Sequence, residues 1–112
     1  MTRWFPPDIV AKNPPYLDTV RAMIRATPVN GFIGCAAALA DHDFRSAVAS
    51  TKPPVLFVAG EKDAGGAVPT AMKSLHQALP GSRYVELATA GHISNLDDPA
   101  GFNRALRGFL RA

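Results

Sequence analysis

Hydrophobic residues are arranged most regularly in the second half of the chain. The run Val55–Ala59 is continuously apolar, follows a Pro-Pro pair and ends at Gly60. Such a run predicts a strand that is buried on both faces, as the strands of parallel sheets are. A second short run, Arg83–Leu87, predicts another strand.

Each predicted strand is followed by a predicted helix. Pro69 suits the first turn of a helix that ends at Pro80-Gly81. Pro99 begins the last helix, with Asp97 or Asp98 as its cap. The apolar faces expected to be buried are Met72, Leu75, Ala78 and Leu79 in the first helix and Phe102, Leu106, Phe109 and Leu110 in the last. The second half is therefore β-α-β-α, with two parallel strands.

The first half of the chain predicts helices alone. From Tyr16 to the stop at Pro28, apolar residues recur at intervals of three and four, which predicts an amphipathic helix. A second helix is expected at about 31–40, and its apolar stripe consists of Phe32, Cys35 and Leu39. The proline pairs at 6–7 and 14–15 leave room for a short helical turn between them.

The predicted class is α/β, with an incomplete sheet. Two strands make a poor sheet, because parallel sheets are normally covered on both faces and extended on both sides. The strand at 55–59 would keep an unpaired edge, which is an aggregation hazard unless another segment covers it. We therefore expect either a homo-oligomer or a complementing N-terminal half that supplies further strands.

Composition excludes several functional classes. The 112 residues are 47% hydrophobic and 19% charged, which is typical of a globular protein. The net charge of +3 is scattered and no basic run alternates with aromatic residues, so no nucleic-acid partner is expected. No membrane partner is expected either, because no apolar stretch approaches the roughly 20 residues of a span. The N-terminus lacks the apolar core of a signal peptide and Cys35 is the single cysteine, which together predict a cytoplasmic location.

Asp63 and His92 are the residues best placed for chemistry. Each lies a few residues beyond the end of a predicted strand, so both belong to the same edge of a parallel sheet. Neighbouring strands are about 5 Å apart, and loops from their ends bring a carboxylate close to an imidazole nitrogen. The carboxylate would fix the tautomer, while the other ring nitrogen would accept a proton from a nucleophile. The pair predicts the base of a triad-like site without its nucleophile.

The other polar candidates have simpler explanations. Glu61 is an alternative carboxylate for His92. His42 lies in a polar turn and His76 on the expected exposed face of its helix, and neither has metal-ligand spacing. Cys35 is expected to pack as a small hydrophobic residue. No metal site and no cofactor are predicted, because no dinucleotide or P-loop motif is present.

These motifs resemble the C-terminal third of an α/β-hydrolase. The resemblance rests on PVLFVAGEKD at 54–63, PG at 80–81 and AGHISN at 90–95. In that family an acid loop, a crossover helix, a histidine loop and a terminal helix follow in this order. The resemblance implies that Asp63 is the triad acid and His92 the triad base.

The first half resembles the 3-oxoadipate enol-lactonase branch of this family. The resemblance rests on segments 3–5, 13–14, 21–23, 26–28, 31–39 and 43–45. It implies a partial helical cap at 1–50 and the C-terminal β-α-β-α part of the hydrolase core at 51–112. It further implies a small ester or lactone substrate of aromatic catabolism. Trp4 is a candidate for lining the acyl pocket, with packing inside the cap as the alternative.

The chain departs from the family at the nucleophile. The family's serine lies on a G-x-S-x-G elbow, and this context is absent at Ser46, Ser50, Ser74, Ser82 and Ser94. We therefore expect the chain to supply acid and base but to be inactive in isolation. The alternatives are another α/β-hydrolase (an esterase, carbon–carbon bond hydrolase or haloperoxidase-like enzyme) and a non-catalytic split piece. An in-frame G-x-S-x-G upstream of Met1 would favour a full hydrolase, whereas its absence would favour the split piece.

Overall fold

Two parallel strands form the centre of the structure, a computed structural model that describes residues 1–40 and 42–111. Strand β1 (Leu56–Gly60) pairs with β2 (Arg83–Leu87) along its whole length, with Gly60 opposite Leu87 at one end. In the described part of the chain the sheet consists of these two strands. The predicted α/β class with an incomplete parallel sheet is confirmed.

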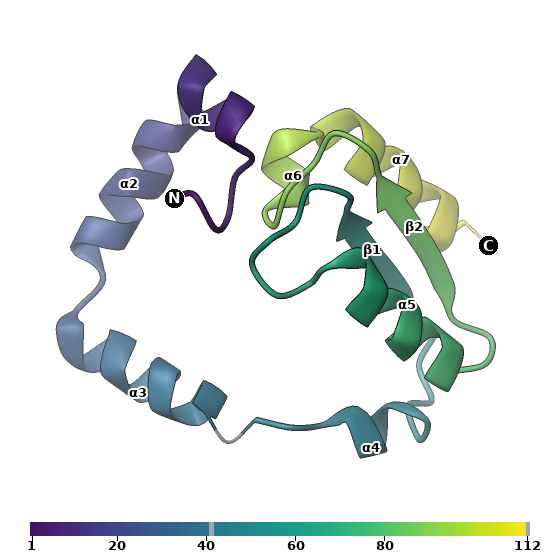
Figure 1. The fold of residues 1–112 in the computed structure, drawn as a ribbon. Helices are drawn as coiled ribbons and strands as arrows, with labels where there is room; N and C mark the ends of the chain where they lie inside the picture. Colours follow the sequence, from purple (N-terminus) through teal and green to yellow (C-terminus); the bar gives the residue numbers. More distant parts are fainter. Residues whose placement is uncertain (41, 112) are drawn as a thin grey trace.

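Helices cover both faces of this sheet. Helix α5 (Pro69–Ala78) connects the strands and packs against both of them, and α7 (Pro99–Leu110) does so from the opposite face (Figure 1). Between β2 and α7 lies the short helix α6 (Ser94–Asp97). The sequence pattern did not predict α6, because a single turn is too short to show helical periodicity.

The first half of the chain forms four helices. Helix α1 (Pro7–Lys12) occupies the space between the proline pairs, as expected. Helices α2 (Tyr16–Ala26) and α3 (Val29–Ala40), here called the arm, extend away from the sheet in an arc (Figure 1). Helix α3 begins two residues earlier than the predicted start at 31. Helix α4 (Arg45–Val48) was expected as a turn.

Burial is concentrated near the sheet and the N-terminal segment. The buried apolar residues are Phe5, Leu17, Ala59, Leu79, Leu87 and Ala90. The expectation for Ala78 was wrong, since it is exposed at the last position of α5. In α7 the half-buried ridge is Phe102, Ala105 and Phe109, whereas Leu106 and Leu110 are exposed. A sheet of two strands is too narrow to cover the flank of α7 on which those leucines lie.

Helix α3 exposes its apolar residues. Phe32, predicted to be buried, is 67% exposed, Leu39 is 69% exposed, and Cys35 is exposed rather than packed. The total exposed area is 7758 Å², against about 5,900 Å² for a compact protein of this mass. The radius of gyration is 15.6 Å, against about 13 Å for a compact chain of this length. The described residues therefore do not close into a compact globule.

The described helices were also compared with the length and hydropathy of a membrane span. No single one of them is long and apolar enough to cross a bilayer. Helices α2 and α3 reach that length and hydropathy only as a pair, and they are bent by 94° at the break between them.

Candidate active site

The loops that follow β1 and β2 bring Asp63 and His92 into contact. The distance between His92 Nδ1 and Asp63 Oδ2 is 2.9 Å. The Asp63 side chain is 1% exposed, whereas the His92 side chain is 30% exposed. It is Asp63, and not the exposed Glu61, that contacts the imidazole. The site thus has a buried carboxylate behind a ring that reaches solvent.

The environment of Asp63 favours its ionised form. Burial acts to raise the pKa of the carboxyl, but hydrogen bonds from His92 and from the amides of Gly65 and Gly66 outweigh it, so the pKa lies below its ordinary value. An ionised carboxylate only accepts hydrogen bonds, which assigns the ring proton to Nδ1 of His92. In the described part of the chain no hydrogen bond uses Nε2. Nε2 therefore keeps its lone pair for an incoming proton.

Two glycines allow the loops to approach this closely. A Cβ atom on Gly60 would lie 2.3 Å from the carbonyl oxygen of Gly91, a distance that backbone atoms cannot accommodate. A Cβ atom on Gly65 would lie 2.9 Å from Cγ of His92 and 3.1 Å from Oδ1 of Asp63. Any larger residue at either position would push the acid loop and the histidine loop apart.

The N-terminal segment holds the histidine loop from the other side. The carbonyl oxygen of Trp4 accepts hydrogen bonds from the amides of His92, at 2.9 Å, and Ile93, at 3.4 Å. The Arg3 guanidinium donates to the carbonyl of Gly65 at 3.4 Å. Sequence reasoning missed these contacts, since a backbone bond across almost ninety positions leaves no periodic signal.

Asp97 has a different place from the one expected. Asp98 alone caps α7, by accepting a hydrogen bond from the amide of Gly101 at 2.8 Å. Asp97 accepts from the amide of Gly91 at 2.8 Å and from the Tyr16 hydroxyl at 3.0 Å. The interpretation of Asp97 as a cap was therefore wrong. Its carboxylate links the start of α2 to the residue before His92.

An apolar hollow lies between the arm and the histidine loop. It measures about 320 Å³ and is lined by Trp4, Val20, Met23, Ile24, Thr27, Ile93 and Leu96. A second hollow of about 250 Å³ shares Trp4, Ile24 and Thr27 and continues to Val29 and Phe32. Trp4 is 39% exposed and lines both. Because Ile93 follows His92 directly, the first hollow lies beside the imidazole-bearing loop.

The remaining polar candidates do not reach this site. His76 is half-buried and its Nδ1 lies 2.7 Å from the Ser82 hydroxyl, so the expectation that it is exposed was wrong. Within residues 1–40 and 42–111 no serine hydroxyl bonds to His92. In the same ranges no three His, Cys, Asp or Glu side chains could hold a metal ion.

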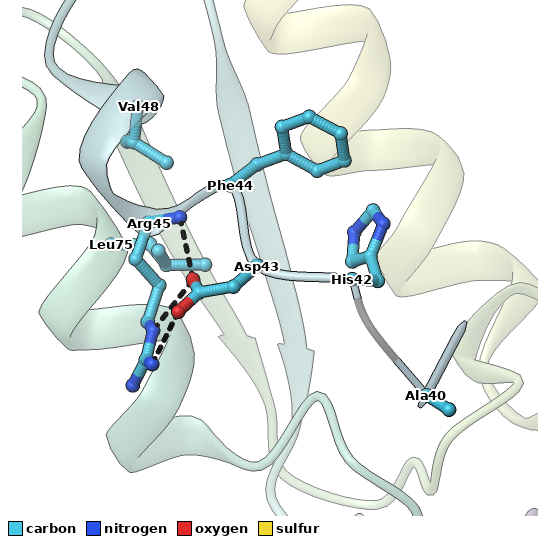
Figure 2. A pocket seen from close by; sticks show the side chains of 7 residues that line it. All are labelled: Ala40, His42, Asp43, Phe44, Arg45, Val48 and Leu75. Atoms are coloured by element: carbon cyan, nitrogen blue, oxygen red, sulfur yellow. Dashed lines mark hydrogen bonds and ion pairs between the residues drawn. The ribbon is translucent and has the colours of Figure 1, made fainter. Parts of the chain in front are cut away.

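A further hollow of about 560 Å³ lies beside α4 (Figure 2). Its charged groups, Asp43 and Arg45, bind each other, and His42 packs edge-on against the ring of Phe44 at 4.5 Å. These groups satisfy one another, so the described residues of this hollow form no constellation for acid–base or nucleophilic chemistry.

Known proteins share this fold, and two solved structures superpose on nearly the whole chain. The enol-lactonase from Burkholderia xenovorans LB400 does so with a TM-score of 0.92 and 32% identity, over 99% of this chain and 42% of that one. A hydrolase from Pseudomonas aeruginosa PA01 does so with a TM-score of 0.90 and 34% identity, over 98% and 41%. The fold is therefore the C-terminal part of an α/β-hydrolase.

Curated relatives narrow this class. The chain is 27% identical over 110 residues to 3-oxoadipate enol-lactonase 2 of Acinetobacter baylyi, which covers 98% of this chain and 40% of that protein. It is 33% identical over 109 residues to a putative carbamate hydrolase, RutD, of Pseudomonas syringae pv. syringae, covering 95% and 41%. No family model matches. The chain is thus related to enol-lactonases and RutD hydrolases, and spans about 40% of their length.

Proposed function

We propose that the chain supplies the acid and base of a serine-type α/β-hydrolase that cleaves a small ester or lactone. The observation that supports this most is the 2.9 Å contact between Asp63 and Nδ1 of His92, which leaves Nε2 free. A carboxylate on one ring nitrogen and an unoccupied second nitrogen is the arrangement of a general base. The relatives named as enol-lactonases support the substrate class.

In this mechanism the imidazole carries one proton in each of two halves. Nε2 of His92 takes the proton of a serine hydroxyl as its oxygen attacks the substrate carbonyl, and returns it to the oxygen of the leaving alcohol. In the second half, Nε2 takes a proton from water as the water oxygen attacks the acyl carbonyl, and then gives that proton to the serine oxygen as the acyl–serine bond breaks, which releases the acid. Asp63 stays ionised throughout, holds the tautomer and stabilises the imidazolium. Its lowered pKa supports that role.

We propose that the serine and the oxyanion donors belong to a complementing N-terminal part. The relatives have more than half of their length outside the match. The exposed area exceeds that of a compact protein by about 1,800 Å², which is more than the roughly 800 Å² that each partner of a standard interface buries. In this view 1–50 is a partial cap and 51–112 the end of the core, and the free edge of β1 receives the next strand.

The substrate side of the proposal concerns the hollow beside His92. Its lining of Trp4, Ile24 and Ile93 has no charged side chain, which suits an apolar acyl group. A carbamate is the second candidate substrate, because relatives with 31 to 33% identity are named as putative carbamate hydrolases. Esters, lactones and carbamates pass through the same acyl-serine chemistry, so a substrate panel separates them.

A chimera tests the proposal. The chain would replace the matching C-terminal part of the Burkholderia enol-lactonase, and lactone, p-nitrophenyl ester and carbamate hydrolysis would be measured. We expect turnover that falls about 10⁴- to 10⁶-fold with His92→Ala and about 10⁴-fold with Asp63→Asn. Trp4→Ala should chiefly raise KM.

Two controls accompany the chimera. Glu61→Gln changes the neighbouring exposed carboxylate and should leave turnover unchanged. The 112-residue chain alone should show no ester hydrolysis that depends on His92. A folded, active chimera that is indifferent to His92→Ala, or a lone chain whose turnover disappears with that substitution, contradicts the proposal.

A further inference from the structure

Asp97 is a half-buried carboxylate that joins segments far apart in the sequence. Its Oδ1 accepts the hydroxyl proton of Tyr16, 81 positions away, at 3.0 Å. Its Oδ2 accepts the amide proton of Gly91 at 2.8 Å. Both oxygens are used, and neither bond serves as a helix cap, since Asp98 performs that function for α7. The carboxylate therefore has a structural task outside its own helix.

That task lies at the residue before His92. Gly91 is buried, so its amide depends on Asp97 for a hydrogen-bond acceptor. The next amide, that of His92 itself, donates to the carbonyl of Trp4 at 2.9 Å. Two successive peptide groups are thus held by two separate acceptors. Fixing both groups fixes the direction in which the His92 side chain leaves the backbone, and that direction leads to Asp63.

The second oxygen of Asp97 connects this loop to the arm. Tyr16 is the first residue of α2, and its ring lies 5.9 Å from that of Phe5, next to Trp4 in the chain. Burial and the bond to Asp97 raise the pKa of the Tyr16 hydroxyl to about 12, so it remains a donor at every physiological pH. A shift of α2 therefore acts on Asp97 through the Tyr16 hydrogen bond.

We propose that Asp97 is a positioning residue for His92, and that through the Tyr16 hydroxyl it couples the placement of α2 to the orientation of the imidazole. Among the described residues no hydrogen bond joins Asp97 to His92 and Asp97 does not line the hollow, so we infer that it acts through the Gly91 amide. The inference rests on the proposed function only in one respect, which is that the function makes the oriented imidazole a general base. A segment that packs against α2 and shifts it would therefore also change the orientation of the His92 imidazole.

Nuclear magnetic resonance on the full chain tests this. Amide exchange at Gly91 and Gly101 and the ring-nitrogen signals of His92 would be compared in wild type, Asp97→Ala, Tyr16→Phe and Asp98→Ala. The last is a matched control, because Asp98 protects the amide of Gly101 at the same 2.8 Å distance. It removes a neighbouring carboxylate and weakens a helix without touching Gly91.

We expect Asp97→Ala to speed exchange at Gly91 about tenfold, as the loss of one hydrogen bond does. The His92 ring should then lose its single Nδ1-protonated form and show a mixture of tautomers. Tyr16→Phe should give the same change at smaller amplitude. Asp98→Ala should speed exchange at Gly101 alone and leave the His92 ring signals as in wild type.

Unchanged His92 ring signals in a folded Asp97→Ala variant overturn the inference, as does an equal change in Asp98→Ala. If Asp97→Ala does not fold, Tyr16→Phe decides, and ring signals identical to wild type then count against the coupling. These signals need no substrate and no nucleophile. If the chimera is inactive while Asp97→Ala changes the His92 ring signals, only the proposed function is overturned. If the chimera is active while Asp97→Ala leaves those signals unchanged, only the positioning role is overturned.

Discussion

Helix α3 and strand β2 both carry apolar residues, yet they bury them very differently. Leu87 at the end of β2 is 6% exposed, whereas Phe32 in α3 is 67% exposed and Val29 is 72% exposed. Strand β2 is paired with β1 and covered by α5 and α7. Among the described residues α3 buries none of its own side chains. An apolar pattern determines which residues favour burial, and the partner determines whether they obtain it.

The two regions should therefore respond differently to substitution. Near the sheet, a change of one atom meets backbone that cannot move. In α3, a substituted side chain is exposed to solvent, so we expect it to change self-association rather than folding stability. The following predictions compare the regions, beginning with the largest expected effect.

Gly60→Ala should cost the most. The new Cβ atom would lie 2.3 and 2.4 Å from two carbonyl oxygens of the histidine loop, so β1 and that loop must separate. We expect a loss of at least about 3 kcal/mol of unfolding free energy, measured by urea denaturation. Gly108→Ala in α7 is the control, because its Cβ atom would meet nothing within 4 Å. Equal stability of both variants would mean that the close approach is not required.

Leu87→Ala should rank second. Removing this buried side chain should cost about 2–5 kcal/mol, through lost burial and a cavity. Phe32→Ala should change stability by no more than about 0.5 kcal/mol, since the ring is already in solvent.

Light scattering measures the self-association that we expect from exposed residues such as Phe32. We expect wild type to self-associate and Phe32→Ala to shift toward monomer. A monodisperse monomer of the wild-type chain would contradict the prediction that the exposed apolar residues of the arm cause self-association.

Acid sensitivity should depend on the sheet-edge carboxylate. The folded pKa of Asp63 lies below its unfolded value of about 3.9, so the unfolded chain binds the proton first. Its stabilising contribution is therefore complete above that unfolded value and is lost as pH falls through the folded pKa. Asp63→Asn should flatten this part of a stability profile measured by urea denaturation between pH 2 and 6.

Asp43 provides the matched control for this profile. Hydrogen bonds from Arg45 likewise lower the pKa of its carboxyl. Both members of that pair are exposed, so salt screens the interaction. Asp43→Asn should leave the acid profile almost unchanged at 0.5 M salt. A stability profile that changes with Asp43→Asn and not with Asp63→Asn would contradict this prediction.

Gly34→Ala should have the smallest effect. A Cβ atom there meets nothing within 4 Å, and replacing a mid-helix glycine stabilises a helix by about 0.5–1 kcal/mol. Because α3 does not pack on the sheet, we expect slower amide exchange within α3 and an unchanged melting temperature. A raised melting temperature would show that α3 and the sheet unfold together.

Much of the local structure could be predicted from the sequence. The run at 83–87 matches β2 residue for residue, and the helix after Tyr16 was expected within two residues of its end. These elements carry their own periodicity and their own proline and glycine boundaries. Asp63 and His92 could be singled out because parallel strands put their following loops at one edge, and their contact is present.

The remainder depended on contacts that no local pattern records. The Trp4 carbonyl on the His92 amide and the Tyr16 hydroxyl on Asp97 join positions more than eighty residues apart. The exposure of Cys35, the half-burial of His76 and the uncovered flank of α7 follow from which surfaces are present to cover them.

The sequence by itself determined the order β-α-β-α, the parallel pairing and the two loops that carry an acid and an imidazole. Only the tertiary structure decided that Asp63 rather than Glu61 meets the imidazole, that Asp97 holds the histidine loop, and that the arm stands free of the sheet. The physical reason is range. Helices, strands and turns form from neighbours in the chain, whereas the orientation of the His92 ring depends on hydrogen bonds and packing contributed from distant segments.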